Sequence, residues 1–278
     1  MFDQKIEEMI EQVQKPARYT GGEMNTAIKP WPEAEVHFAF CFPDTYEVAM
    51  SHLGMKILYG VINQQPWALC ERVCMPWVDM KALMEKEGVP LFSLETRTPL
   101  NRFDVVGFTL QYEMSYSNIL AMLKLGGIPL HTAERTDADP IVCVGGPCAF
   151  NPEPLADFVD AVMIGDGEEM IVEFIAAVRE WKKSGEPREA CLRRLAKIPG
   201  VYVPSFYEVS YHEDGTIAAF TPKCPEAPAT VRKRLVLDMD KAYYPTEIPV
   251  PYTAAPAVAA FAKRGFCTAR CGSVPWSG

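Results

Sequence analysis

The chain has 278 residues, enough for about two domains, and its apolar (49%) and charged (23%) fractions are those of a globular protein. This composition excludes collagen, coiled coil and low-complexity disorder for the chain as a whole. The formal net charge of −9 argues against a general nucleic-acid surface or an anionic membrane as the partner. No apolar stretch reaches the roughly 20 residues that cross a bilayer. Nine scattered cysteines are typical of reduced thiols and predict a cytoplasmic protein.

The N-terminal residues 1–32 predict a helix and an irregular lead-in. Apolar residues stand at helical spacing among carboxylates over the first 16 residues, which predicts an amphipathic helix and not a signal peptide. Glycine and proline clusters then interrupt the chain up to residue 32.

Strand and helix patterns alternate over residues 33–198. Strands are predicted at 36–42, 68–73, 91–94 (an edge strand), 105–110, 140–144 and 158–164, and helices at 51–62, 78–86, 115–125 and 169–183. This alternation predicts an α/β fold with a doubly wound, mostly parallel, Rossmann-like sheet, because right-handed βαβ units build such a sheet.

The pattern changes over residues 199–253. Two strands at 201–210 and 217–220, separated by a turn at 213–215, predict a β-hairpin. Frequent prolines follow. This part is predicted to be a small C-terminal β appendage and a linker, and residues 254–278 an irregular tail.

Ligands of open α/β sheets bind beyond the carboxyl ends of the strands, and two such loops are rich in polar residues. In the loop 43–54 the residues before the helix suit an anion, although a simple helix cap explains them equally well. In the loop 109–118 the density of hydroxyl and amide groups favours ligand contact. The candidate cofactor-binding residues of these loops are Asp44, Ser51, His52, Leu53, Gly54, Tyr112 and Ser115.

Two further strand-end loops carry glycines, which permit either close approach of a ligand or only a tight turn. Their candidate cofactor-binding residues are Gly145, Gly146, Pro147, Gly165, Gly167 and Glu168. Neither loop completes G-x-G-x-x-G, since Met170 stands where the third glycine of the second loop would be. A dinucleotide site of standard design is therefore not expected, nor is an ATP site, because no Walker A lysine is present.

Near the C-terminus, Cys267 and Cys271 form a C-x-x-x-C pair that is a candidate metal site. A [4Fe–4S] cluster needs three or four thiolates, and the position of the third is occupied by Val274. The motif is therefore incomplete.

Four segments resemble the N-terminal half of B12-binding-domain radical SAM proteins of an uncharacterised subfamily: residues 40–59, 107–113, 145–154 and 160–169. The similarity covers about residues 17–253. It implies that residues 33–198 form a cobalamin-binding type of domain and that a radical SAM barrel follows. In that family a Cys-x-x-x-Cys-x-x-Cys motif holds a [4Fe–4S] cluster, which cleaves S-adenosylmethionine to a 5′-deoxyadenosyl radical.

Two features depart from the family pattern. The B12 motif Asp-x-His-x-x-Gly is absent, because Asp44 and His52 are eight residues apart, so His52 is a poor candidate for the cobalt ligand. Residues 254–278 stand where the barrel would begin and resemble only a divergent remnant of it. We therefore expect a shortened or frame-shifted product that holds no stable cluster and is inactive alone.

The sequence leaves two classes of function open. The first is the cobalamin-binding part of a radical SAM enzyme that acts on an unknown substrate. The second is a stand-alone module that binds a corrinoid or another small ligand and regulates a partner. A nucleotide-dependent oxidoreductase is disfavoured by the missing fingerprints.

Overall fold

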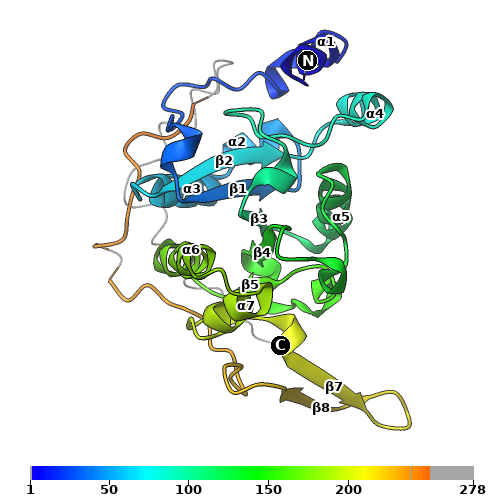
Figure 1. Ribbon diagram of the computed structural model, residues 1–278, viewed down its shortest axis with the longest axis vertical. Coiled ribbons are helices and arrows are strands. Elements are labelled where there is room, and N and C mark those ends of the chain that lie inside the picture. Colours follow the sequence, from blue (N-terminus) through cyan, green and yellow to red (C-terminus); the bar gives the residue numbers. More distant parts are fainter. Residues whose placement is uncertain (1, 239, 251–278) are drawn as a thin grey trace, which may run out of the picture.

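The computed structural model describes residues 2–238 and 240–250, and a six-stranded sheet forms its centre (Figure 1). Five strands are parallel in the order β2-β1-β3-β4-β5, and β6 joins the β5 edge in the antiparallel sense. The strands are β1 (Val36–Phe42), β2 (Ala68–Cys74), β3 (Val105–Thr109), β4 (Ile141–Gly145), β5 (Ala161–Met163) and β6 (Val201–Tyr202). The predicted mostly parallel sheet is confirmed.

Helices cover both faces of this sheet, which confirms the doubly wound arrangement (Figure 1). On one face lie α3 (Leu53–Asn63) and α6 (Gly167–Ser184), which contact each other. The other side carries α1 (Phe2–Ile10), α4 (Val78–Glu87) and α5 (Tyr116–Leu125). Within the described residues, no helix is long and apolar enough to span a membrane.

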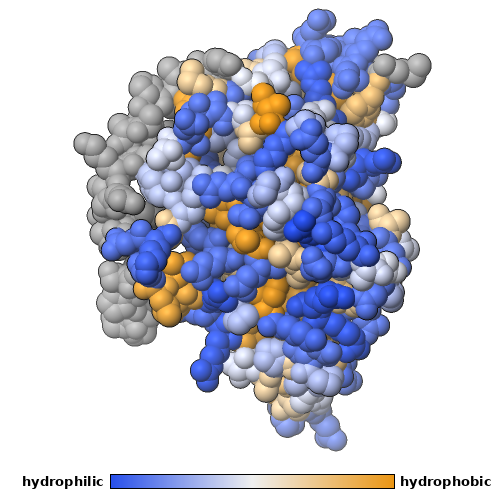
Figure 2. Space-filling model, turned by 60° about the vertical axis from the view of Figure 1, so that its left-hand side comes forward, coloured by the Kyte–Doolittle hydropathy of each residue, from blue (hydrophilic) through white to orange (hydrophobic). Residues whose placement is uncertain are grey.

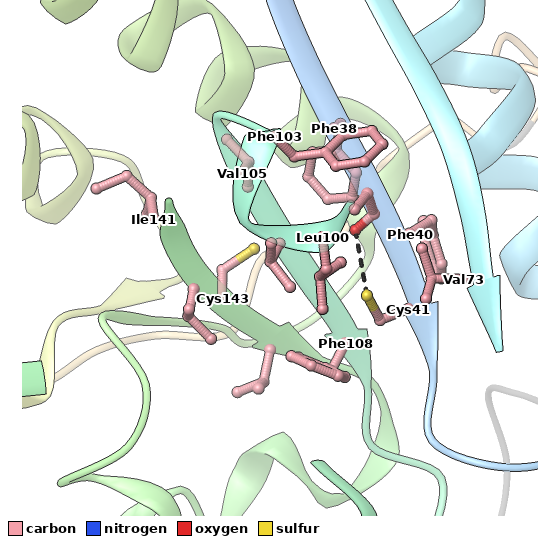
Figure 3. Close-up of a cluster of buried hydrophobic side chains, with 14 of the residues drawn as sticks. Phe38, Phe40, Cys41, Val73, Leu100, Phe103, Val105, Phe108, Ile141 and Cys143 are labelled. Carbon is pink, nitrogen blue, oxygen red and sulfur yellow. Dashed lines mark hydrogen bonds between the residues drawn. The ribbon is translucent and has the colours of Figure 1, made fainter. Parts of the chain in front are cut away.

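The core lies on the faces of the central strands, where their side chains pack against the helices; Figure 3 shows part of it. All seven residues of β1 are buried, because a parallel strand between two neighbours is covered on both faces. Gly107 of β3 makes room for Phe38, since a Cβ there would lie 2.4 Å from the Phe38 ring. Leu100 and Phe108 pack in the same cluster (Figure 3).

Two helices were not expected from the sequence. α2 (Tyr46–Ser51) occupies the first half of the loop after β1, and α7 (Arg188–Ala196) packs against α6 and β6. α7 shows only a weak apolar stripe, because arginines and a glutamate occupy four of its nine positions.

The edge strand predicted at residues 91–94 is wrong. Only Phe92 forms an isolated bridge, with Pro99. The backbone amides of its neighbours bond to separate partners, because Leu91 donates to the Leu125 carbonyl and Leu94 to the Arg72 carbonyl. Because these backbone amides bond to different segments, residues 91–94 do not form the ladder of hydrogen bonds that a strand needs.

The strand predicted at residues 201–210 is two strands. β6 pairs with β5, and Pro204 then begins a short 3-10 turn that redirects the chain into β7 (Tyr207–Tyr211). β7 and β8 (Ile217–Pro222) form the predicted hairpin, which projects from the body (Figure 1). The main sheet therefore extends past the domain boundary predicted at residue 198.

Residues 231–238 and 240–250, called the strap below, run back along the side of α6 and α3 (Figure 1). Arg234 forms a parallel bridge with Gly165 after β5, and Val250 pairs with Met24 near the N-terminus. On the side that Figure 2 shows, apolar surface is limited to separate patches between hydrophilic residues.

Candidate ligand-binding edge

The strand order places a topological switch point between β1 and β3. From β1 the chain crosses to β2 on one side, and from β3 it continues to β4 on the other. The loops that leave these two strands therefore diverge, and ligands of open α/β sheets bind in the crevice between them. The predicted cofactor-binding residues lie at the last position of β4 or in the loops and helices that follow β1, β3, β4 and β5 at this carboxyl edge.

The loops after β1 and β3 meet at the switch point. The Tyr112 hydroxyl donates to Asp44 Oδ2 at 3.4 Å, and the Asn118 side chain donates to the Pro43 carbonyl at 3.0 Å. The Asp44 carboxylate also accepts from the Thr45 amide at 2.6 Å. The Tyr112 ring is 45% exposed. The structure thus brings Asp44 and Tyr112 together on an accessible surface.

His52 caps the first turn of α3. Its Nδ1 accepts from the Met55 amide at 3.1 Å. Burial lowers the pKa of His52, and a contact with the Gln111 side chain opposes this shift. In a neutral ring whose Nδ1 accepts, Nε2 carries the proton and neither nitrogen has a free lone pair. His52 in this state is unsuited to bind cobalt, which agrees with the absence of the Asp-x-His-x-x-Gly motif.

Other predicted residues of these two loops serve local structure. The Ser51 hydroxyl donates at 2.7 Å to the carbonyl four residues earlier, within α2. The buried Ser115 hydroxyl donates to the carbonyl three residues earlier, also at 2.7 Å. A side chain at Gly54 would lie 2.9 Å from the ring of His52. Leu53 begins α3 and packs against the core.

Two of the predicted glycines accommodate the chain's own backbone. Gly146 has a φ of +112°, and a Cβ there would lie 2.9 Å from the Leu110 carbonyl oxygen. Gly165 has a φ of +115°, and a Cβ there would lie 2.1 Å from the Arg234 carbonyl oxygen in the strap. The close approach predicted for a ligand is thus made by other parts of the chain at both positions.

The remaining candidates lie beside these glycines. The Gly145 carbonyl accepts from the Leu110 amide at 2.6 Å, and Pro147 begins a short 3-10 helix. Gly167 and Glu168 are the first residues of α6, where a carboxylate suits the helix dipole.

Large apolar side chains are exposed at the same edge, and the sequence analysis missed them. Met114 after β3 is 82% exposed and Phe150 after β4 is 62% exposed. Val48 in α2 and Leu237 in the strap are exposed as well. An apolar residue in an otherwise polar strand-end loop was the available sequence signal. These side chains are exposed at the carboxyl edge, where open α/β sheets bind their ligands.

The donors at this edge suit a large organic ligand. Among the residues that the structure describes, no three His, Cys, Asp or Glu side chains converge as a metal site. The candidate metal ligands Cys267 and Cys271 lie outside the described residues. Aromatic, thioether, hydroxyl and carboxylate groups occur together at this edge, and small-molecule sites commonly combine apolar surface with a few polar groups.

A family model described as radical SAM proteins, N-terminal, matches residues 54–204. The chain belongs to this family. The resemblance found in the sequence is thereby confirmed, and the match runs from the start of α3 to the turn after β6. An uncharacterized protein of Methanocaldococcus jannaschii is 30% identical over 99 residues, which are 35% of this chain and 21% of that protein.

Two solved structures of radical enzymes show partial similarity to this radical SAM N-terminal domain. The S-adenosylmethionine methyltransferase TsrM from Kitasatospora setae, solved with tryptophan and a SAM analog, is 14% identical, with a TM-score of 0.38 over 64% of this chain and 29% of that chain. The cobalamin-dependent enzyme OxsB, solved with aqua-cobalamin, is 13% identical, with a TM-score of 0.36 over 69% of this chain and 24% of that chain. The family assignment rests on the sequence match and not on these likenesses.

Proposed function

We propose that this radical SAM N-terminal domain binds a corrinoid over the switch point between β1 and β3. The observation that carries the proposal is the contact of the exposed Tyr112 with the Asp44 carboxylate, at an edge whose loops also expose Met114 and Phe150. Cofactor sites combine an apolar surface with a few fixed polar groups, and they lie preferentially at such switch points.

The residues at the edge have distinct parts in this proposal. Tyr112, Met114 and Phe150 offer apolar contact to the face of the ring. Asp44 accepts hydrogen bonds from the amide side chains at the corrinoid rim, and its bond from Tyr112 orients it. His52 keeps its capping role, so the corrinoid is held without an imidazole ligand from this residue. When bound, a corrinoid supplies a cobalt centre that can carry an alkyl group.

In the radical SAM protein as a whole, this domain has the role of holding the corrinoid near a second reaction centre. The [4Fe–4S] cluster and S-adenosylmethionine belong to that centre, which lies outside the described residues. The family membership supports the radical SAM part of the proposal.

Retention of hydroxocobalamin tests the proposal. The purified chain is incubated with it anaerobically, passed through gel filtration and examined by its visible spectrum. We expect about one corrinoid per chain and a roughly tenfold or larger loss of affinity in Tyr112→Ala/Met114→Ala, because two apolar contacts are removed.

Two control variants sharpen this test. Tyr211→Ala removes an aromatic residue that is 64% exposed on the distant hairpin, and it should leave retention unchanged. His52→Ala should also retain the corrinoid, and the reduced cobalt should show the same electron paramagnetic resonance spectrum as in the unmodified chain. Absence of binding, or an equal loss in Tyr211→Ala, would contradict the proposal.

A further inference from the structure

A cavity of about 550 Å³ lies at the other edge of the sheet, where β6 is the last strand. One wall is the turn from α7 into β6, residues 196–201, and the other is the proline-rich segment 225–232. Binding sites for small molecules commonly have volumes of about 300–1,000 Å³. None of the residues assigned to the corrinoid lines this cavity.

The cavity lining carries more positive than negative charge. Lys197 and Arg232 line it, and within the described part of the chain neither takes part in an ion pair. Glu226 is the carboxylate of the lining. It accepts from Arg193 Nη1 at 2.9 Å, and the charge of Lys197 acts on it as well. This local excess of cations is unusual in a chain whose net charge is −9. It favours an anionic ligand.

The rest of the lining is mainly apolar. Ile198 and Val201 contribute from one wall, and Pro225, Pro228 and Val231 from the other. Prolines hold their wall in a restricted backbone conformation, which lowers the entropy lost on binding. The lining therefore suits a ligand with an apolar body and a charged end.

The proline-rich wall is fixed to the sheet just beyond Arg232. The Arg234 amide donates to the Ile164 carbonyl at 2.9 Å, and its carbonyl accepts from the Asp166 amide at 2.9 Å. The Arg234 guanidinium also bonds to Glu169 and Glu173 of α6, at 3.1 and 2.7 Å. The cavity is thus preformed and does not depend on a loop closing over the ligand.

We propose that this cavity is a second binding site, for a small organic anion. Its carboxylate or phosphate group bonds to Arg232 and Lys197, and its apolar body lies against Ile198, Val231 and Pro228. A guanidinium binds both kinds of anion through two parallel hydrogen bonds. The site is independent of the proposed corrinoid, since it shares no residue with the switch point.

Calorimetric titration of the full chain with phenyl phosphate and with benzoate tests this proposal and distinguishes the two anions. Inorganic phosphate is the third probe, and it should bind at least about tenfold more weakly than phenyl phosphate because it lacks the apolar body. Arg232→Gln should weaken binding of the better probe by about tenfold or more.

Lys233→Gln is the matched control, because Lys233 is exposed beside Arg232 and does not line the cavity. It should change the affinity by less than about twofold. The free energy of such a change is a small fraction of that of one hydrogen bond to a charged group. Circular dichroism checks that both variants fold. The proposal is overturned if neither organic probe binds at millimolar concentration, if inorganic phosphate binds as tightly, or if Lys233→Gln weakens binding as much as Arg232→Gln. Corrinoid retention should be the same in both variants.

Discussion

The two ends of the parallel sheet use polar side chains in opposite ways. At the amino end, Asp160 Oδ2 accepts from Arg135 at 2.8 Å, from Arg188 at 2.7 Å and from the Val142 amide at 2.7 Å. At the carboxyl end, Asp44 faces an accessible surface and has a long bond from Tyr112.

This difference separates charged groups that stabilise the fold from charged groups that are accessible to a ligand. Asp160 and Arg135 are almost fully buried, so each needs the other to remain charged inside the protein. His37 at the amino end of β1 is similarly enclosed, bonded to Asp104 at 3.0 Å and to the Trp31 carbonyl at 2.9 Å. Polar groups with all their partners inside the chain stabilise it, whereas those with spare bonding capacity at an accessible edge can bind a ligand.

The largest effect on stability is expected at the amino end. Asp160→Ala leaves two buried guanidinium groups without a carboxylate and should lower the free energy of unfolding by about 3–5 kcal/mol. Asp44→Ala at the carboxyl end should lower it by less than about 1 kcal/mol, as for exposed pairs. Urea unfolding followed by circular dichroism measures both. Equal losses of unfolding free energy in the two variants would contradict the difference between the two ends of the sheet.

An intermediate effect is expected where the strap crosses the carboxyl end. Gly165→Ala places a Cβ against the Arg234 backbone at a positive φ and should cost about 1–3 kcal/mol. Gly22→Ala is the matched control, because it has a φ of +74° and no atom within 4 Å of the added Cβ. Limited proteolysis of the strap should accelerate only in Gly165→Ala. The same rate in both variants would show that the bridge between Gly165 and Arg234 does not hold the strap.

A smaller effect is expected at Glu71, a buried carboxyl group of β2 that lacks an arginine partner. Burial raises the pKa of Glu71, although Ser93 and Thr96 donate to its Oε2 at 2.5 and 2.7 Å. Since the raised pKa means that the folded state binds the proton more tightly, the contribution of Glu71 to stability falls as pH rises above the unfolded value near 4.5.

The variant Glu71→Gln tests this contribution, because glutamine cannot ionise. Between pH 5 and pH 7 its free energy of unfolding should fall less than that of the unmodified chain, measured by urea unfolding at each pH. An identical pH dependence in the two proteins would show that Glu71 keeps an ordinary pKa.

The sequence predicts the central strands well because their residues are buried on both faces. The six apolar residues of β1 and the run at 105–110 give apolar patterns, and Pro43 ends the first while Asp104 and Gln111 flank the second. The sequence does not predict β6, since a two-residue strand depends on its pairing with β5. It does not predict α7 either, because the apolar stripe of that helix is weak. Local patterns do not encode these distant contacts.

The sequence predicts where the candidate residues lie better than it predicts what each of them does. The strand-end rule brings Asp44 and Tyr112 to one edge, where the structure has them in contact. The glycine signal at Gly165 is present in the sequence, but its partner Arg234 is 69 positions away and cannot be read from spacing. Exposed Met114 and Phe150 become visible only when the fold shows which loop residues remain uncovered.

Hydrogen–deuterium exchange with and without hydroxocobalamin tests most directly whether the carboxyl end is the ligand-binding end. The account predicts slower exchange in the loops 43–54 and 109–118 when the corrinoid is bound, and unchanged exchange around Asp160 and His37 at the amino end. Protection confined to the amino end, or no change in the loops 43–54 and 109–118 despite retained corrinoid, would contradict it.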